Sequence, residues 1–533
     1  MKRSISRLLA LLMALLLAGA VPAMAGGTTT ESGMTIWDSP QSFSLWVGMG
    51  KMAGVVEDWS QNLVFQTMAE ETNVTIEFQH PAVGGETDAF NLMCATGDYP
   101  DAIQYAWPTA PGGPANYIND GVIIPLNDLI DAYMPNLKAY LEAHPDFDRM
   151  CKLDDGTYYM LPSIYEEVDL ATDQGLIVRG DFLDELGITA DELPTTLDGW
   201  EELLIQVRDC EELEGVIPFM FVTMSNITDT NAIVGAWGIC QEFYNDNGTV
   251  KYGALQPEYK EFLALMRRWF EEGLIDPEFA ANTAKLRDEK VTGDRVFLFL
   301  GSMGNAITRY TGMCRNEDNP DFSLLPQAYP TLEEGEVCPV GRRGNLIGSG
   351  LAITTSCSPE TAEVICKYYD YFYTEEGHML SNWGVEGYTY DYDENGEPYF
   401  LPLVVESEEG WSREQGMAKY TIWQTDSPVY KKGDVLAQRD CLPEQIEGRE
   451  KWMECENAII MPPVTPTADE ANEFATIMND CTTYLYEQAS KIIMGEVDLD
   501  EGYDIMVSTL KGMGIDRAIE LRQAALDRYL ART

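Results

Sequence analysis

The chain has 533 residues, of which 45% are hydrophobic, and a formal net charge of −53. This length exceeds that of a typical domain and the apolar content is sufficient for large cores, so the composition excludes a disordered chain and favours two or more lobes. The acidic balance excludes a surface that binds nucleic acid or anionic lipid, because both require basic clusters.

The N-terminal segment has the pattern of a secretory signal. Lys2, Arg3 and Arg7 precede an apolar run over residues 8–20, and a small-x-small cleavage site follows it. The run is too short for a membrane span, and no later stretch reaches the roughly 20 apolar residues that a span requires. We therefore expect residues 1–25 to be a signal peptide. The expected mature protein is exported and lacks a lipid-acceptor cysteine.

The first hundred mature residues alternate between strand and helix patterns. In chain order, the predicted strands and helices are 43–47, 62–72, 74–78, 88–96 and 102–107. This β-α-β-α-β order is typical of a parallel sheet covered by helices. Ligands of such sheets bind at the carboxyl ends of the strands, which is where Trp46 and Trp107 occur.

The stretch from Asp154 to Glu167 contains a turn signal at Asp155-Gly156 and then an aromatic strand pattern that ends at a proline. One interpretation is an ordinary hairpin with an acidic end. The other is a strand that leaves one lobe and enters the next, with a hinge at Leu161, Pro162 and Ser163. The second interpretation places Tyr165 and Glu166 just beyond the crossing.

Later segments are predominantly helical. Trp200 and Trp269 lie on the apolar stripes of predicted helices, which indicates core positions. Ser358-Pro359-Glu360 begins another helix, and Thr467 with Glu470 forms a capping box before two further amphipathic runs. We expect a helical C-terminal region and, because no period repeats, neither a solenoid nor a propeller.

Catalytic and metal-binding patterns are scarce. The three histidines lack metal-ligand spacing, and no P-loop, HExxH, GxSxG or GxGxxG motif occurs. Asp391–Gly396 resembles half of an EF-hand loop but has Pro402 where a bidentate glutamate is required, which favours a hairpin turn. The eleven cysteines lack any CxxC pair, so no disulfide framework is expected, although Cys151, Cys338 or others could pair. We predict no metal and no cofactor.

Six segments carry a resemblance to a known family. They are 94–101 (CATGDYPD), 121–126 (GVIIPL), 155–162 (DGTYYMLP), 177–187 (IVRGDFLDELG), 272–277 (EGLIDP) and 383–390 (WGVEGYTY). In this order and spacing the chain resembles the family 1 extracellular solute-binding proteins of bacterial ABC importers, in the sugar-binding branch. The resemblance implies an α/β, two-lobed periplasmic-binding-protein-like fold of type II, with crossing hinge strands between the lobes. The implied lobes are 34–160 with 300–350, and 161–299 with 351–533.

The resemblance also implies a function and a site. The chain would capture a carbohydrate between its lobes, close by a hinge motion and deliver the ligand, as a monomer, to a membrane permease. Sugars present apolar faces that stack on aromatic rings, and hydroxyls that need planar donors and acceptors. The expected ligand-binding residues are Trp46, Trp107, Tyr165, Glu166, Arg179, Trp237, Trp383, Glu386 and Tyr388. Two alternatives remain: a secreted polysaccharide-acting enzyme with an acid pair, and a binding protein for a peptide or another non-sugar solute.

Overall fold

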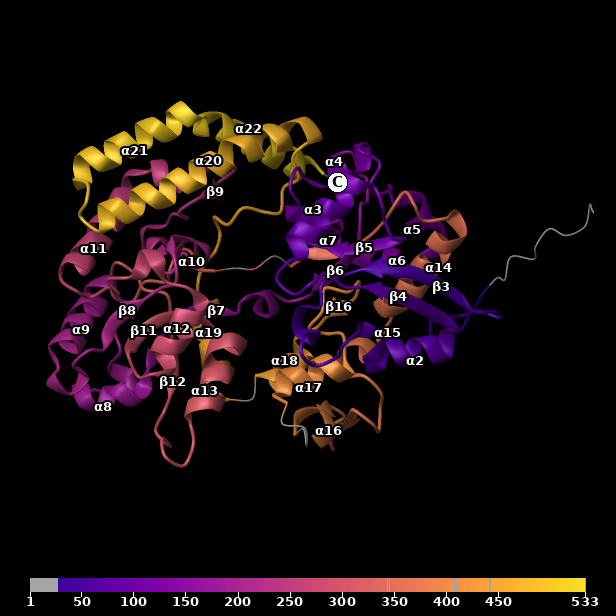
Figure 1. The fold of residues 1–533 in the computed structure, drawn as a ribbon, viewed down its shortest axis with the longest axis horizontal. Coiled ribbons are helices and arrows are strands. Elements are labelled where there is room, and N and C mark those ends of the chain that lie inside the picture. The colour runs from indigo at the N-terminus through magenta and orange to yellow at the C-terminus, as the bar shows by residue number, and fades with distance from the viewer. Residues whose placement is uncertain (1–26, 343, 345, 407–410, 441, 533) are drawn as a thin grey trace, which may run out of the picture.

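Two lobes lie side by side in the computed structural model, with several chain segments passing between them (Figure 1). The structure describes residues 27–532 except 343, 345, 407–410 and 441. The predicted signal peptide lies outside the described residues. Within the described part of the chain, no helix is both long and apolar enough to cross a lipid bilayer.

The first lobe is built on a six-stranded sheet. In spatial order its strands are β16 (Tyr430–Lys431), β6 (Leu161–Tyr165), β13 (Ser349–Ile353), β5 (Ala102–Tyr105), β3 (Gln41–Trp46) and β4 (Val74–Gln79). β3 pairs in parallel with both β4 and β5, as the β-α-β-α-β pattern predicts. The helices α2 (Leu63–Thr72) and α3 (Glu86–Thr96) connect these strands, close to their predicted positions.

The second lobe contains a four-stranded sheet. Its order is β12 (Leu324–Gln327), β7 (Gln174–Arg179), β11 (Val296–Ser302) and β8 (Ile217–Met220), with β11 and β8 parallel. The helices α9 (Leu197–Asp209) and α11 (Pro257–Glu271) pack their apolar stripes into the core of this lobe. Trp200 and Trp269 are fully buried there, which confirms their predicted core positions.

The C-terminal region is helical, as predicted. Helices α20 (Ala468–Ile493), α21 (Leu499–Met513) and α22 (Ile515–Ala531) pack against the second lobe, at the upper left of Figure 1. Thr467 and Glu470 form the expected capping box. The chain then returns to the first lobe, where Arg528 and Arg532 both pair with Asp154.

The two sheets divide the chain differently from the expected boundaries. β13 is hydrogen-bonded between β5 and β6, so the following helix α14 (Pro359–Asp370) covers the first lobe. There Tyr368 packs edge-on against Phe43 of β3, with ring centroids 5.8 Å apart. Conversely, β11 and β12 belong to the second sheet. The first lobe therefore takes residues 27–165 and most of 346–436, and the second takes most of 174–340 and 443–520.

The predicted hinge residues lie inside the first sheet rather than between the lobes. Leu161, Pro162 and Ser163 belong to β6 and pair with β13. Ile164 N donates to Val429 O, and because backbone nitrogens two residues apart face the same side of a strand, the Pro162 nitrogen also faces β16. β16 pairs only with Ile164 and Tyr165 and does not extend to Pro162, so no backbone donor is needed there and a proline is tolerated. The chain leaves the first lobe only after Tyr165, through the short helix Val168–Ala171. It is back in the first lobe at Leu346, whose carbonyl oxygen accepts from Tyr165 N at 2.8 Å.

The EF-hand-like segment forms a hairpin, as expected. β14 (Tyr390–Tyr392) pairs antiparallel with β15 (Pro398–Phe400). Asp393 Oδ1 accepts hydrogen bonds from the backbone nitrogens of Asn395 and Glu397, both at 2.8 Å. Its carboxylate is therefore engaged within the turn.

Candidate functional site

A groove opens at the carboxyl ends of the parallel strands of the first lobe. β3 ends at Trp46 and β5 at Tyr105, and because Trp46 is paired with Ile103, these ends lie side by side. The cavity there has a volume of about 540 Å³. We call it the aromatic groove; its lining residues are Trp46, Val47, Gly48, Gly50, Lys51, Trp59, Glu86, Gln104, Tyr105, Ala106, Tyr165, Gln424, Thr425 and Asp426.

Aromatic rings form a fixed wall of this groove. The Trp46 ring lies 6.2 Å from Tyr105, and Phe90 stacks behind Tyr105 at 4.0 Å. On the β6 side, the Lys431 ammonium lies 4.2 Å from the centre of the Tyr165 ring, while its nitrogen donates to Thr425 O at 2.7 Å. Rings held in this way are preorganised to stack against an apolar ligand face.

Polar groups of several kinds surround the rings. Gln104 is buried, yet its Oε1 atom has no hydrogen-bond partner among the described residues. A buried acceptor without a partner costs free energy unless a ligand or water satisfies it, so Gln104 is suited to a hydroxyl donor. Lys51 and Asp426 are exposed at the rim and add a donor and an acceptor. The groove therefore combines the two kinds of contact that a sugar requires.

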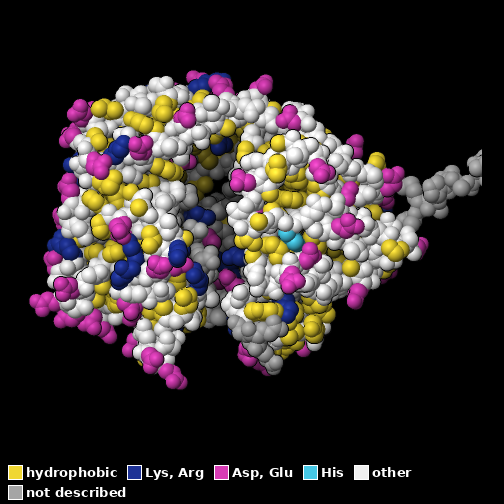
Figure 2. Space-filling view, in the orientation of Figure 1, with side chains coloured by type: hydrophobic (Ala, Val, Ile, Leu, Met, Phe, Trp, Pro, Cys, Tyr) yellow, Lys and Arg dark blue, Asp and Glu magenta, His cyan; other side chains and the backbone are white. Residues whose placement is uncertain are grey.

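A second cavity, of about 460 Å³, is walled by both lobes. Residues 108–113 contribute from the first lobe, residues 461–464 and Pro466 from a connecting segment, and Phe243, Phe474 and Arg522 from the second lobe. The short helix Trp107–Thr109 lies between the two linings along the chain, since Ala106 lines one cavity and Pro108 the other. Figure 2 shows the deep furrow between the lobes, with Lys and Arg side chains along its walls.

Arg522 is the charged group of this second cavity. Its guanidinium lies 4.3 Å from the Phe474 ring centre and 5.7 Å from that of Phe243. Its Nε atom is buried without a hydrogen-bond partner among the described residues, and burial lowers the pKa of the guanidinium. Arg522 is therefore a donor available to a ligand that spans both lobes.

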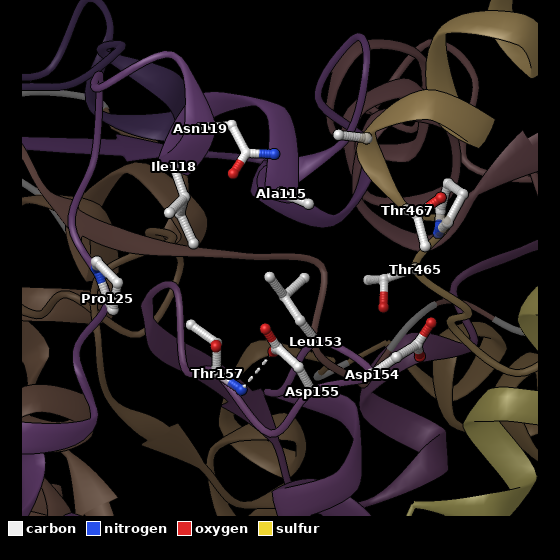
Figure 3. A pocket seen from close by; sticks show the side chains of 12 residues that line it. Ala115, Ile118, Asn119, Pro125, Leu153, Asp154, Asp155, Thr157, Thr465 and Thr467 are labelled. Atoms are coloured by element: carbon white, nitrogen blue, oxygen red, sulfur yellow. Dashed lines mark hydrogen bonds between the residues drawn. The ribbon is translucent and has the colours of Figure 1, made fainter.

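A third cavity, of about 370 Å³, lies where the first lobe meets the segment that leads into α20 (Figure 3). Thr157 N donates to Asp155 Oδ1 at 3.0 Å within it. Asp154 is already paired with Arg528 and Arg532, and no aromatic ring lines the cavity. The residues that line this cavity therefore connect the first lobe to the C-terminal helices, and they offer no ring for a sugar to stack on.

The structure brings two of the predicted site residues, Trp46 and Tyr165, to the aromatic groove. Both come from the first lobe, although the resemblance implied that Tyr165 belongs to the second. Glu166 lies just outside: its Oε1 accepts a hydrogen bond from the Tyr140 hydroxyl at 3.2 Å, with His144 at 4.0 Å. Burial and the Glu166 charge raise the pKa of Tyr140.

Other predicted residues are used in packing. Trp107 is fully buried and donates to Ile103 O, and Trp383 is fully buried 4.8 Å from Phe400. Arg179 is buried between the rings of Phe182 and Phe322, and its guanidinium donates to Asp181, Asp294 and Val291 O. None of the three lines a described cavity.

The remaining predicted residues also lie away from the described cavities. Trp237 donates to Glu261 Oε2 at 2.9 Å on the surface of the second lobe. Glu386 and Tyr388 are exposed in the turn before β14, with the Tyr388 ring 6.4 Å from Tyr420. A strand-end or loop position is a weak indicator of a site, because it does not say which lobe or which face a ring will join.

The sequence missed Tyr105, Gln104, Asp426 and Arg522. Gln104 carries a usable signal, since it is the polar residue inside a four-residue strand whose other members are Ala102, Ile103 and Tyr105. Asp426 comes from a loop far along the chain, and no local pattern indicates its position beside Trp46. Within the described residues, no group of three or more His, Cys, Asp or Glu side chains is placed to hold a metal ion.

Comparison with known proteins identifies the class of fold. The fructooligosaccharide ABC transporter substrate-binding protein FusA of Streptococcus pneumoniae is 25% identical over 504 residues, covering 89% of this chain and 88% of FusA. Lipoprotein LipO of Bacillus subtilis is 22% identical and covers 80% of this chain and 81% of its own. The structure of the alginate-binding protein AlgQ2 matches with a TM-score of 0.72 at 24% identity, covering 92% of this chain and 98% of AlgQ2.

These homologues and structural neighbours include substrate-binding proteins of ABC transporters. The predicted resemblance is thus confirmed, as is the two-lobed α/β fold with its C-terminal helices. No protein-family model matches the sequence.

Proposed function

We propose that this protein is the extracellular substrate-binding component of an ABC importer and captures an oligosaccharide in the furrow between its lobes. The observation that carries the proposal is the match to FusA, a fructooligosaccharide-binding protein, along almost the whole length of both chains. AlgQ2, which shares the fold, is named as an alginate-binding protein.

The chemistry of the aromatic groove supports a carbohydrate ligand. Trp46, Tyr105 and Tyr165 offer ring surfaces, while Gln104 and Asp426 offer acceptors for hydroxyl donors. In this proposal the ligand stacks on these rings in the first lobe and extends past the helix Trp107–Thr109 to the second cavity. Contacts from both lobes would then favour the closed form that the permease recognises.

The protein acts as a binding protein rather than an enzyme in this proposal. FusA is named as a substrate-binding protein of an ABC transporter. Glu86 and Asp426 both line the aromatic groove, so the alternative of an acid pair is tested by incubating the pure protein with oligosaccharides and measuring new reducing ends. Release of reducing ends that stops in Glu86→Gln would establish the enzyme instead.

Export, the permease partner and a monomeric state belong to the same proposal. The relatives include a transporter substrate-binding protein and a lipoprotein, both consistent with a place outside the cytoplasmic membrane. Detection of the protein at the cell surface, together with a single monomer mass by light scattering, is the expected result. A cytoplasmic location would contradict the proposed role.

Calorimetric titration with a panel of oligosaccharides tests the ligand class. Binding should also change the tryptophan emission, because Trp46 lines the groove. In Tyr165→Ala, loss of one stacking ring worth about 0.5–1.5 kcal/mol predicts roughly 2- to 12-fold weaker binding, while Tyr165→Phe should bind nearly as well as wild type. Tyr388→Ala is the matched control, since Tyr388 is 52% exposed and lies outside the groove. Equal loss in both alanine variants, or binding of peptides and not sugars, would refute the proposed site or ligand.

A further inference from the structure

Two cysteines of the second lobe lie together although they are far apart in sequence. Cys338 precedes the segment that returns to the first lobe, and Cys455 follows α19 (Pro443–Met453). Their backbones are joined directly, because Glu456 N donates to Cys338 O and Asn457 N donates to Pro339 O, both at 3.1 Å. Asn457 Oδ1 also accepts from Gly341 N at 2.9 Å.

The two thiols are held close to one another. The Cys455 thiol is close enough to Cys338 to interact with it, and Cys338 Sγ donates to Val340 O at 3.3 Å. Gly341 leaves the room for this arrangement, since a Cβ atom at that position would lie 2.6 Å from Cys455 Sγ. Cys338 is buried and Cys455 is partly exposed, so one sulfur is protected and the other can be reached from solvent.

We propose that Cys338 and Cys455 form a disulfide bond when the protein meets an oxidising environment. The backbone hydrogen bonds between the two segments, and the position of Cys455 Sγ beside Gly341, bring the two side chains together as a disulfide requires. An exported protein encounters such conditions, and in that respect alone the inference rests on the proposed function.

The chemistry is an exchange with a small disulfide oxidant such as glutathione disulfide. One protein thiolate attacks a sulfur of the oxidant, forming a mixed disulfide and releasing one glutathione thiolate. The second protein thiol loses its proton and attacks the mixed disulfide, which forms the Cys338–Cys455 bond and releases the second glutathione. Because Cys455 is the partly exposed thiol, it meets the oxidant first, and the buried Cys338 is the thiol that closes the bond.

The bond would have a specific mechanical effect. The chain between the two cysteines contains β13, α14 and β16, which is the second portion of the first lobe. A disulfide would therefore close a long loop at the base of the interlobe connections and restrict the unfolded chain, and restriction of this kind increases with loop length. It lies outside the aromatic groove and leaves the ligand contacts unaltered.

The test uses the purified full chain, first reduced and then equilibrated with glutathione disulfide. Thiol titration after denaturation should fall from eleven to nine, peptide mapping should find residues 338 and 455 linked, and the thermal midpoint should rise. Cys455→Ser should keep all ten of its thiols and show no rise. Cys210→Ser, another partly exposed cysteine of the second lobe, is the control and should still lose two.

Other results would overturn the inference. Eleven thiols remaining after oxidation, a link between other cysteines, or glutathione left bound on either residue would each exclude the proposed bond. Because the thiol count does not depend on any sugar, failure of this inference and failure of the proposed function are separately visible.

Discussion

Replacing Asp440 with asparagine should destabilise the folded protein while leaving its affinity for ligand unchanged. Asp440 is 2% exposed and lies where the chain passes from the first lobe to the second for the last time before α19. Its Oδ1 accepts from Arg439 Nε at 2.7 Å, and its Oδ2 accepts from Arg449 Nε at 3.1 Å. Arg449 Nη1 also donates to Thr172 O at 2.9 Å, so this ion cluster joins two interlobe segments.

The magnitude follows from the burial of the cluster. Asparagine preserves size but removes the charge, which leaves the guanidinium groups of Arg439 and Arg449 without their shared counter-ion in a site where both side chains are at most 15% exposed. Breaking a buried ion pair from one side costs about 3–5 kcal/mol. At about 2 °C per kcal/mol for a lobe of roughly 250 residues, the thermal midpoint should fall by about 6–10 °C.

Calorimetric unfolding measures the midpoint, and titration with the best oligosaccharide of the panel measures affinity. Asp38→Asn is a matched control at an exposed position and should change stability by no more than about 0.5 kcal/mol. A midpoint lowered by less than about 2 °C would show that the cluster is not a structural joint. A large loss of affinity with an unchanged midpoint would place Asp440 in the ligand site instead.

Three further results are expected. Burial alone would raise the pKa of Asp440, but the hydrogen bonds and charges of Arg439 and Arg449 lower it below its ordinary 3.8, so its contribution is present above that pH and is lost as the pH falls through the folded value. The difference in the free energy of unfolding between wild type and Asp440→Asn, measured by urea titration, should accordingly become smaller below pH 3.8. A difference that does not change with pH would contradict the role of the Asp440 charge. Arg179→Ala should lower the free energy of unfolding by about 3–5 kcal/mol, measured with denaturant, because it breaks the ion pairs with Asp181 and Asp294. Its sugar affinity should not change, since these groups lie outside the described cavities. Weaker binding with unchanged stability would identify Arg179 as a ligand contact instead. Asp154→Ala should free the end of α22 from the first lobe, because Arg528 and Arg532 lose the carboxylate that they share. A loss of about 1.5–3 kcal/mol should accelerate amide exchange at this helix end roughly 10- to 150-fold, and unchanged exchange would show that these ion pairs do not hold it.

Local patterns predicted the first sheet well. The alternation of strand and helix patterns before Trp107 places β3, α2, β4, α3 and β5 within a few residues of their actual bounds, because each element shows its buried face in the periodicity of its residues. The same holds for the helices that bury Trp200 and Trp269, and for the capping box of α20. The order of short family-like segments predicted the fold class, which the comparisons with FusA and AlgQ2 confirm.

The tertiary structure decided which lobe each later segment joins. β13 reads as a short apolar strand in isolation, and only its pairing between β5 and β6 assigns it and the following helix to the first lobe. Likewise Pro162 lies within β6, where the short neighbouring strand β16 leaves its nitrogen without a pairing position. The chain crosses between the lobes only after Tyr165.

By itself, the sequence determined the elements, the two-lobed α/β class and the supply of aromatic rings. The composition of the aromatic groove depended on the tertiary structure, because Trp46, Gln104, Tyr165 and Asp426 come from four separate parts of the chain. Strand pairing, a non-local contact with no trace in local periodicity, brings the strand residues together. Packing between distant segments also buries Trp107 and Trp383, although in the sequence their positions look equally suited to a ligand.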